Sequence, residues 1–460
     1  MLKKRITFRK TRSPFAFIDF FIHFNTLLLI GGAGFMLYEF HHQFEEIREM
    51  LLSSSFGLLF IFFSLFTAVF KVVFLLYVFS HYLRYKSISS VEDHELPSIT
   101  VIVPAYNEGR FVFNTLKSIC ESDYPGEKLQ ILAIDDGSKD DTWEWMQKAK
   151  LALGEAIEIY QQPENKGKRH ALYTGFHMAN GDIFVTIDSD SIIEKGTLRN
   201  LVSPFIVDHH CGAVAGNVKV YNNRKAIIPK MLSMSFAYSF GFIRAAQSHM
   251  KTVLCTPGAL SAYRKDAVMA CLDEWMNQTF MGLKTDIGED RAMTNMIMKQ
   301  GWHILFQSNA LVYTKIPENY NNLRRMYIRW ERSNVREIFM MSKFAFSNFR
   351  PSHTWNPRLL LFSQWLTMLA AYPAVLAMLL ILFAYPRLFF SSTIVSVALF
   401  SIVPALYCGI KHNKRKAFWI FTYNIFHSFT LFWITPYAIL TVRKRGWLTR
   451  NHVEAEQVGK

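Results

Sequence analysis

The feature that most constrains this sequence is a set of apolar segments on both sides of a central block of mixed composition. Each segment can cross the ~30 Å hydrocarbon core of a membrane as a helix rising about 1.5 Å per residue. Two segments precede the block and three follow it, at residues 15–38, 56–82, 359–384, 389–410 and 417–442. The chain is therefore predicted to be a membrane protein with one sizeable domain outside the bilayer.

The charges beside these segments predict an orientation. Six Lys and Arg residues lie within the first twelve positions, whereas residues 39–49 hold four Glu and one Arg. Because cytoplasmic loops carry an excess of Lys and Arg, the N-terminus and the central block are expected in the cytosol. No small-residue cleavage site follows the first apolar run, which favours a retained helix over a signal peptide. We expect an integral protein of the plasma (inner) membrane.

The last apolar segment conflicts with this orientation. Residues 411–416 are strongly basic and are expected in the cytosol, so a simple third crossing would place basic residues 443–445 outside. We therefore predict a broken or re-entrant final segment, with a break near Pro436, that returns the tail to the cytosol. Irregular backbone at this depth must be buried in protein or line a cavity.

Two ionisable residues interrupt the first two segments. Asp19 and Lys71 are functional candidates because charges inside a membrane are rare. The plain alternative is that Asp19 lies near the interface and that Lys71 snorkels or pairs.

Composition excludes some classes of protein. The chain has 460 residues, is 51% hydrophobic and carries a formal net charge of +15. This basic balance suits anionic headgroups and phosphorylated substrates as well as nucleic acid. The sequence has no RNP motif or zinc-finger spacing, so no nucleic-acid partner is expected. The five cysteines are scattered without a CxxC pair, which indicates buried structural thiols in a reducing compartment.

The central block alternates between short apolar runs and helical stretches. Strands are predicted at 98–104, 129–134, 156–161, 183–187 and 212–220, and helices at 109–122, 141–153, 168–178 and 196–207. This alternation predicts an α/β fold, with a mostly parallel sheet inserted between N- and C-terminal transmembrane helices. The predicted division is two transmembrane helices in 1–84, the α/β domain in 85–322, amphipathic interface helices in 323–357, and a C-terminal transmembrane region with a cytosolic tail in 358–460.

Polar clusters follow three of the predicted strands, at residues 105–108, 135–138 and 188–190. Each cluster alone is an ordinary turn or helix start. Ligands of such sheets bind beyond the carboxyl ends of the strands, so three clusters there predict one shared site. Asp188 and Asp190 carry carboxylates that suit Mg²⁺ or Mn²⁺, an ion that neutralises a nucleotide diphosphate.

These motifs make the block similar to the family 2 glycosyltransferases, inverting enzymes with a GT-A-type nucleotide-sugar fold. Within that family the chain most resembles the membrane synthases of hyaluronan, chitin and chitooligosaccharides. The matching pieces run in family order over residues 102–108, 135–138, 165–171, 188–190, 288–291, 329–330 and 447–450.

The resemblance implies a role for individual residues. Asp290 would be the catalytic base that deprotonates the acceptor, with Glu289 beside it, and Asp190 would hold Mg²⁺ or Mn²⁺ with support from Asp188. The residues implied in nucleotide-sugar binding are Asn107, Glu108, Asp135, Asp136, Lys168, Arg169, Asp188, Arg329, Trp447 and Arg450. Asp135 or Asp136 would meet the uracil edge. The residues implied in acceptor binding are Trp330, Gly258 and Ser261.

Plainer interpretations remain for several of these residues. Residues 323–340 are predicted to form a helix with one basic stripe, made by Arg325, Arg329, Arg332 and Arg336. Such a stripe is typical of a membrane surface. The resemblance instead assigns Arg329 to the diphosphate and Trp330 to the acceptor sugar, whose apolar face suits an indole.

Three further points weaken or compete with the resemblance. Met326 stands where the family usually has Gln, which removes a polar contact near the acceptor. Asp290 also fits a simple helix cap. Residues 166–169 also fit an exposed basic turn.

The implied function is a processive, Mg²⁺- or Mn²⁺-dependent membrane enzyme. It would polymerise UDP-sugars, namely UDP-N-acetylglucosamine with or without UDP-glucuronate, into a β-linked polysaccharide and translocate it. Its partners would be the UDP-sugar, the growing polysaccharide and the lipid bilayer; the sequence does not set an oligomeric state. The alternatives are a non-processive lipid glycosyltransferase and a β-glucan synthase that uses UDP-glucose. A transporter or receptor with a sensing domain would explain the spans but not the ordered acidic clusters.

Overall fold

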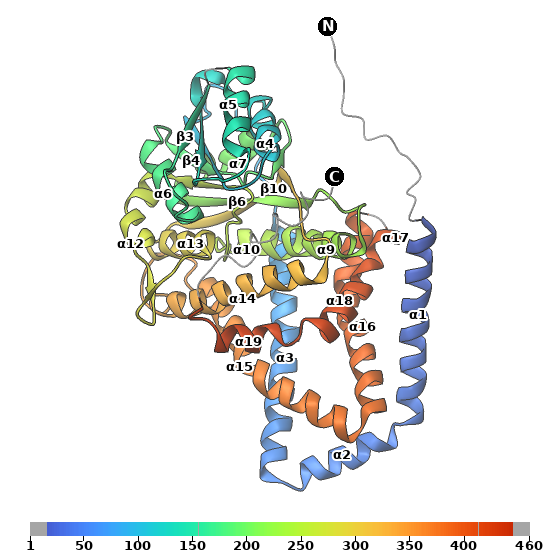
Figure 1. Ribbon diagram of the computed structural model, residues 1–460. Coiled ribbons are helices and arrows are strands. Elements are labelled where there is room, and N and C mark those ends of the chain that lie inside the picture. Colours follow the sequence, from blue (N-terminus) through green and yellow to red (C-terminus); the bar gives the residue numbers. More distant parts are fainter. Residues whose placement is uncertain (1–15, 155, 413, 445–460) are drawn as a thin grey trace.

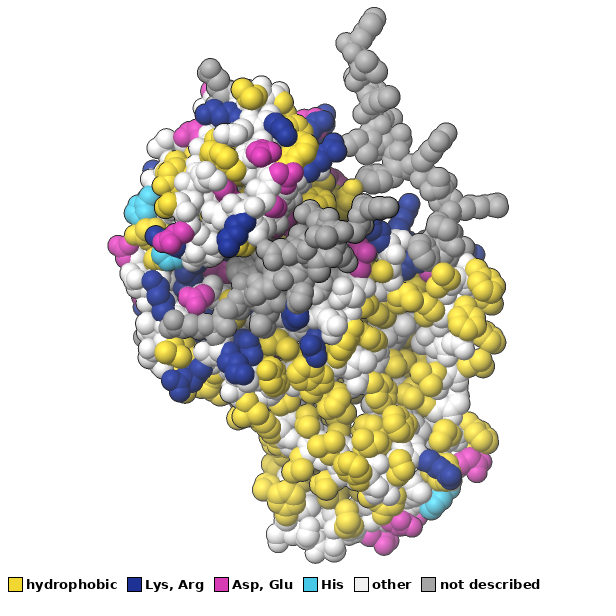
Figure 2. Space-filling model, viewed as in Figure 1, with side chains coloured by type: hydrophobic (Ala, Val, Ile, Leu, Met, Phe, Trp, Pro, Cys, Tyr) yellow, Lys and Arg dark blue, Asp and Glu magenta, His cyan; other side chains and the backbone are white. Residues whose placement is uncertain are grey.

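A computed structural model describes residues 16–154, 156–412 and 414–444. In this part of the chain four helices are long and apolar enough to span a membrane: α1 (Ala16–Glu39), α3 (Ser55–Arg84), α15 (Trp355–Ala384) and α16 (Pro386–Lys411). They extend from one side of the α/β domain (Figure 1). Exposed apolar side chains cover this half of the molecule (Figure 2). The protein is therefore a membrane protein.

The loops of the membrane part differ in charge. The short helix α2 (His42–Leu52) joins α1 to α3 at the end farthest from the α/β domain (Figure 1). This helix carries Glu45, Glu46 and Glu49. The basic helix α17 (Lys414–Ala417) lies at the opposite end of the spans, beside the α/β domain. Acidic and basic loops thus lie on opposite sides, as the charge pattern predicts.

The α/β domain is built on a mostly parallel sheet. Its strands are β1 (Ile99–Ala105), β2 (Leu129–Asp135), β3 (Ile157–Gln161), β4 (Ile183–Thr186), β5 (Ile192–Ile193), β6 (Cys211–Val220), β7 (Ser261–Arg264) and β10 (His303–Thr314). Their order is β3-β2-β1-β4-β7-β6-β10-β5, in which β7 and β5 run antiparallel to their neighbours. A separate hairpin pairs β8 (Thr279–Phe280) with β9 (Leu283–Lys284). The predicted sheet is confirmed.

Helices cover both faces of this sheet. They are α4 (Phe111–Cys120), α5 (Thr142–Leu153), α6 (Lys168–Met178), α7 (Thr197–Val202), α8 (Pro204–Val207), α10 (Ala245–His249), α11 (Lys265–Met269), α12 (Leu272–Met276) and α13 (Glu289–Lys299), with a 3₁₀ turn at Gly126–Lys128. Every residue of β1 is buried, as expected for a central parallel strand covered on both faces. Gly175 of α6 permits this packing, because a Cβ there would lie 2.5 Å from Cγ2 of Ile102.

Two long helices lie between the sheet and the membrane spans (Figure 1). They are α9 (Ile227–Tyr238), which continues into a π-helix (Ser239–Arg244), and α14 (Tyr320–Ser342). Of the two interpretations of the basic stripe on α14, the membrane surface does not fit its second half. Arg332 and Arg336 are only 3% and 4% exposed, and Arg336 donates to the Ile287 carbonyl at 2.7 Å. Arg325 and Arg329 are half-buried, so the second half of the stripe is the part that is packed inside the protein.

The final apolar segment is broken, as the charge conflict predicts. It forms α18 (Trp419–Thr430) and α19 (Ile434–Leu440), which are too short to span a bilayer singly. The break lies at residues 431–433, and Pro436 falls inside α19 instead of at the break. Arg332 of α14 donates to Thr441 Oγ1 at 3.1 Å, so the chain returns to the side of the α/β domain.

The two ionisable residues of the spans have ordinary surroundings. Asp19 forms an ion pair with Lys230 of α9, which fastens the first span to the layer beneath the sheet. Lys71 is exposed on α3. Pairing is the plain alternative for Lys71 rather than for Asp19, yet in this structure Asp19 is the residue that pairs.

Candidate active site

The carboxyl ends of three strands meet at one edge of the sheet. Ala105, the last residue of β1, pairs in register with Asp135, the last residue of β2. Asp188 follows β4, the other neighbour of β1. The hydroxyl of Thr115 in α4 donates to the Ser189 carbonyl at 2.8 Å, which fixes the turn that carries Asp188 and Asp190. The structure therefore brings the three predicted polar clusters together.

Lys168 connects this sheet edge to helix α13. Its Nζ lies 2.5 Å from Oδ1 of Asp188 and 3.2 Å from Oε1 of Glu289. Although burial opposes a charged side chain, Asp188 and then Glu289 raise the pKa of Lys168 above its ordinary value. One ammonium thus joins a carboxylate of the strand-end cluster to the first residue of α13.

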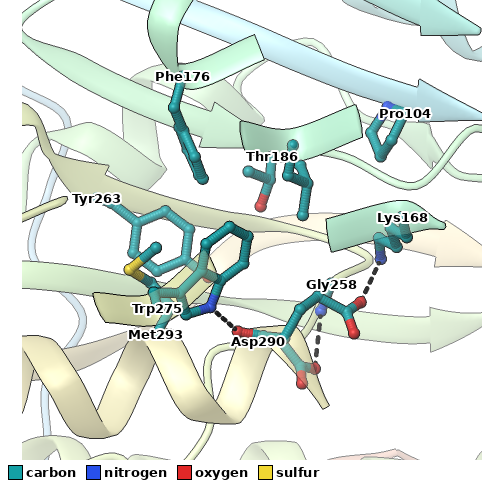
Figure 3. Close-up of a pocket in the computed structure, with 11 residues that line it drawn as sticks. Pro104, Lys168, Phe176, Thr186, Gly258, Tyr263, Trp275, Asp290 and Met293 are labelled. Carbon is teal, nitrogen blue, oxygen red and sulfur yellow. Dashed lines mark hydrogen bonds and ion pairs between the residues drawn. The ribbon is translucent and has the colours of Figure 1, made fainter. Parts of the chain in front are cut away.

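Gly258 lies beside both Lys168 and Asp290 (Figure 3). Its backbone N–H donates to Oδ2 of Asp290 at 3.3 Å. A Cβ at this position would lie 2.5 Å from Nζ of Lys168 and 3.5 Å from Oδ1 of Asp188. Asp188 and Asp290 therefore lie on either side of one backbone segment, and only a glycine leaves Lys168 its place between them.

Glu289 and Asp290 are adjacent but differ in their electrostatics. Burial, and then the charge of Glu289, raises the pKa of Asp290. Burial would also raise the pKa of Glu289, but Lys168 and Arg329 hold it below its ordinary value. Two neighbouring carboxyls with opposite pKa shifts are typical of a site that divides acid and base roles.

Asp290 is held by donors on both of its oxygens. Oδ1 accepts the N–H of Arg291 at 2.7 Å, and Oδ2 accepts from Gly258. The Cys255 thiol lies 3.7 Å from Oδ2. Burial, and then Asp290, raises the pKa of Cys255 to about 12, so this thiol stays protonated and donates. The carboxylate is thus fixed in orientation before any acceptor arrives.

The cavity beside these residues is small. Lys168, Gly258, Glu289 and Asp290 line it together with apolar side chains that include Trp275 (Figure 3). Its volume is about 10 Å³, which is space for about one water molecule. The indole N–H of Trp275 donates to the Glu289 carbonyl at 2.9 Å and so supports the start of α13.

Comparison with known proteins agrees with this geometry. The family profile described as "Glycosyltransferase like family 2" matches residues 97–333, which is more than half of the chain. The chain belongs to this family. The protein is therefore a glycosyltransferase, and its sheet has the GT-A-like arrangement of that family.

Two curated relatives of this glycosyltransferase are informative. An N-acetylglucosaminyltransferase of Rhizobium meliloti (strain 1021) is 33% identical over 251 residues, which cover 54% of this chain and 58% of the relative. A hyaluronan synthase of Streptococcus pyogenes is 28% identical over 370 residues, which cover 77% of this chain and 84% of the relative. The chain thus spans little more than half of the first relative and most of the second.

A solved structure supports the fold. The mannosyltransferase PcManGT from Pyrobaculum calidifontis, in complex with GDP-Man and Mn²⁺, superposes with a TM-score of 0.54 at 22% identity. The match covers 87% of the glycosyltransferase described here and 99% of that chain. The resemblance extends to the architecture alone.

Several predicted nucleotide-binding residues of the glycosyltransferase organise loops. Asp136 accepts the N–H groups of Lys166 and Gly167 at 3.0 and 2.8 Å, which ties the basic loop to the sheet edge. Asp135 is fully buried and accepts from Ser138 and Gln161. The predicted uracil contact therefore fits Asp135 poorly, because both of its oxygens already accept hydrogen bonds.

The loop after β1 is held in a similar way. Asn107 has a left-handed backbone with φ of +52° and accepts the Lys139 N–H at 2.9 Å. The N–H of Glu108 donates to the Thr142 hydroxyl at 2.8 Å. Both side chains are partly exposed at the sheet edge, where a nucleotide could reach them.

Arg169 and Ser261 do not reach the site surface. Arg169 is only 3% exposed and donates to the Trp275 carbonyl at 2.7 Å and to Gln278. Ser261 is fully buried in β7 and donates to the Pro257 carbonyl at 2.6 Å. Their predicted contacts with nucleotide and acceptor are at odds with this burial, because both side chains donate to backbone carbonyls inside the protein.

The structure describes only some of the predicted residues beyond α13. Arg329 lies close enough to Glu289 to lower its pKa. Trp330 is 37% exposed and packs against Phe236 of α9, with ring centroids 6.2 Å apart. Trp447 and Arg450 lie outside the described residues.

The carboxylates at the sheet edge suit a divalent ion. Within the described ranges no three His, Cys, Asp or Glu side chains gather into a metal-binding set. Mg²⁺ in nucleotide enzymes takes one or two carboxylates and receives its other ligands from phosphates and water. Asp188 and Asp190, two residues apart on one fixed turn, match that donor set.

Two contacts could not be found from the sequence. Trp275 supports Glu289, but a single tryptophan gives no sequence signal. Gly288 meets Ser333 of α14 so closely that a Cβ would lie 1.9 Å from its hydroxyl. The glycine before two acids hints at a tight turn, yet nothing in the sequence names Ser333 as its neighbour.

Proposed function

We propose that the protein is a processive inverting glycosyltransferase that polymerises UDP-sugars into a β-linked polysaccharide and translocates it across the plasma membrane. The observation that carries the proposal is the bridge formed by Lys168. It joins the Asp188 turn to Glu289, beside Asp290, in a chain that also has four helices of membrane-spanning length. The catalytic domain would lie in the cytosol, where nucleotide sugars are available.

Charged side chains would bind the diphosphate of the donor nucleotide sugar. Asp190 and Asp188 would hold Mg²⁺ or Mn²⁺, which neutralises the diphosphate as it leaves. Lys168 and Arg329 would add positive charge along the phosphates, and the partly exposed Asn107 and Glu108 would bind the nucleoside. The Mn²⁺ complex of the mannosyltransferase supports a divalent ion in this fold.

The acceptor side uses Asp290 as general base. It would take the proton of the acceptor hydroxyl while that oxygen attacks C1 and the bond from C1 to the diphosphate breaks. Its raised pKa makes it a stronger base than an exposed aspartate. Glu289, kept ionised by Lys168, would hold the bridge in place and is not expected to exchange protons.

A row of aromatic side chains supports processivity. Trp330 packs against Tyr327 with ring centroids 5.6 Å apart, and the Tyr327 hydroxyl lies 2.6 Å from that of Tyr423 in α18. His427 adjoins the same tyrosine. The row connects Trp330 of α14 with Tyr423 and His427 of the broken segment, and aromatic faces suit pyranose rings. A growing chain would follow it.

The names of the relatives support N-acetylglucosamine as one sugar. UDP-N-acetylglucosamine is therefore the first donor to test, and UDP-glucuronate the second. We further propose that residues 1–84, 85–322, 323–357 and 358–460 are the functional units, with Trp447 and Arg450 among the nucleotide-sugar-binding residues. Ser261 and Arg169 would act by supporting Gly258 and α6.

Product analysis tests the proposal. The purified full-length protein is given each radiolabelled UDP-sugar singly and in pairs, and products are sized before and after chitinase or hyaluronidase digestion. We expect a polymer from UDP-N-acetylglucosamine, alone or with UDP-glucuronate. A single-sugar glycolipid would establish the non-processive alternative, and a product made only from UDP-glucose would establish a β-glucan synthase.

A further inference from the structure

A second cavity lies away from the catalytic carboxylates. It is an open groove of about 650 Å³ formed by the β8–β9 hairpin, the C-terminal half of α14 and the end of α19. Its walls include Phe280, Phe339, Ile439 and Val442. This volume lies within the range of small-molecule sites, and none of the functions assigned above uses it.

The groove belongs to the membrane boundary. Phe339 packs edge-on against Trp365 of α15, with ring centroids 4.9 Å apart. Val335 and Val442 pack with Met368 of the same span. Since α15 is one of the four membrane-length helices, the apolar wall of the groove lies beside a membrane span.

The rim of the groove is positively charged. Lys343 and Arg443 line it and are exposed, whereas none of its lining residues is acidic. Neither cation forms a salt bridge with another residue of the described ranges. On the face drawn in Figure 2, Lys and Arg side chains gather where the α/β domain meets the apolar half. Apolar walls with a basic rim suit an occupant that combines an apolar chain with a negative group.

We propose that this groove binds an anionic phospholipid. The acyl chain lies against Phe280, Phe339 and Ile439, and the phosphate lies between Lys343 and Arg443. The lipid would bind beside the β8–β9 hairpin, which precedes Gly288 in the chain. The Thr285 N–H donates to the Gln278 carbonyl at 3.0 Å and holds the two ends of this hairpin together. The site is independent of the sugar that the enzyme uses.

Photo-labelling tests the site directly. The full-length protein, purified and delipidated, is mixed with phosphatidylglycerol that carries a photoreactive acyl chain, and labelled peptides are identified by mass spectrometry. We expect labels on peptides containing residues 279–284, 335–343 and 439–443, and competition by unlabelled phosphatidylglycerol but not by phosphatidylcholine.

A charge-matched pair of variants supplies the control. Each basic side chain near an anionic surface strengthens binding by roughly five-fold, so K343Q/R443Q should lower the labelling roughly ten-fold or more. K150Q/K195Q removes the same charge from exposed positions of the α/β domain and should leave the labelling unchanged. Thermal unfolding of both variants checks that they remain folded.

Four results would overturn the proposal. Equal labelling by phosphatidylcholine would show that the groove does not select charge, and unchanged labelling of K343Q/R443Q would show that these cations do not bind the headgroup. Competition by inorganic phosphate alone would make this an anion site. Labelling that appears only after deletion of residues 445–460 would assign the groove to the C-terminal segment.

Discussion

At the scale of single residues, the candidate base depends on its immediate neighbour. Asp290 and Glu289 share the first turn of α13, where the helix dipole favours negative charge. Burial nevertheless raises the pKa of Asp290, and the adjacent charge of Glu289 raises it further. The base strength of Asp290 therefore depends on a carboxylate that has no proton to exchange.

This dependence predicts the effect of E289Q on the pH profile. Because the base must be ionised, kcat/KM of the wild type should fall as the pH drops through the raised pKa of Asp290. Removing the charge of Glu289 should lower that pKa and move the acidic limb to lower pH. The measurement is kcat/KM against pH for both proteins.

The raised pKa of Asp290 also affects the stability of the protein, and stability should depend on pH in the opposite direction to activity. An aspartate with a raised pKa stabilises the fold in its protonated form, so the free energy of unfolding should fall as the pH rises through that pKa. For the activity measurement, the contradicting result is a kcat/KM profile whose acidic limb lies at the same pH in E289Q and in the wild type. That result would show that Asp290 is not the titrating base.

Gly258 gives a second prediction at this scale. In G258A the new methyl group would displace Lys168 Nζ, which lies 2.5 Å from the Cβ position. The end of a lysine is flexible, so the free energy of unfolding should change by only about 1 kcal/mol. Turnover should fall at least ten-fold because the bridge is lost. Turnover near that of the wild type would show that the bridge is not needed.

At the scale of elements, the contact between α13 and α14 aligns the two halves of the site. Gly288 has a left-handed φ of +77° and touches Ser333, four residues from Arg329 on the next turn of the helix. The turn before Asp290 thereby contacts α14, the helix that contains Arg329 and Trp330, the residues proposed to bind the diphosphate and the acceptor. The contact requires glycine, because a Cβ at position 288 would overlap the Ser333 hydroxyl.

A pair of glycine variants separates strain from contact. Gly282 has nearly the same φ, +78°, but nothing lies within 4 Å of its Cβ position. G282A should therefore show conformational strain alone, about 1 kcal/mol. G288A adds the clash with Ser333, so it should destabilise by about 2–4 kcal/mol and reduce turnover more than 10-fold.

Thermal unfolding and turnover of both variants provide the check. Equal effects of G282A and G288A would show that the α13–α14 contact contributes nothing beyond the local backbone.

At the scale of the whole molecule, the membrane part is joined to the layer beneath the sheet through charged contacts. Asp19 of α1 pairs with Lys230 of α9, whose ammonium also lies 5.6 Å from the ring of Trp419 in α18. One lysine thus contacts the first span and the broken final segment together. The charge of Asp19 therefore helps to hold the first span against the rest of the protein.

A double-mutant cycle tests this joint. D19N and K230M should each destabilise the protein, and the double variant should recover about 1 kcal/mol relative to the sum, because the pair is partly exposed. Thermal unfolding of the four proteins in one detergent gives the coupling. Additive effects would mean that the pair does not hold the first span.

The sequence predicts the sheet, the spans and the broken final segment because hydrophobic period and loop charge are local properties. It also predicts that Asp188 and Asp290 belong to one site, through their family order. The sequence does not predict contacts between residues that lie far apart in the chain. The burial of Arg336 depends on the Ile287 carbonyl, and the burial of Arg169 depends on Trp275, and neither pairing follows from spacing. A basic stripe looks the same in sequence whether it faces lipid or protein.

The central claim is that one site contains both the Asp190 turn and Asp290. The most direct measurement is UDP released from UDP-N-acetylglucosamine by the wild type, D190A and D290N, with thermal unfolding as the control for folding. Loss of a general base costs about 10²–10⁴-fold, so D290N should lose at least 100-fold while it remains folded. D190A should lose activity to a similar degree. Turnover within ten-fold of the wild type in both folded variants would contradict the account.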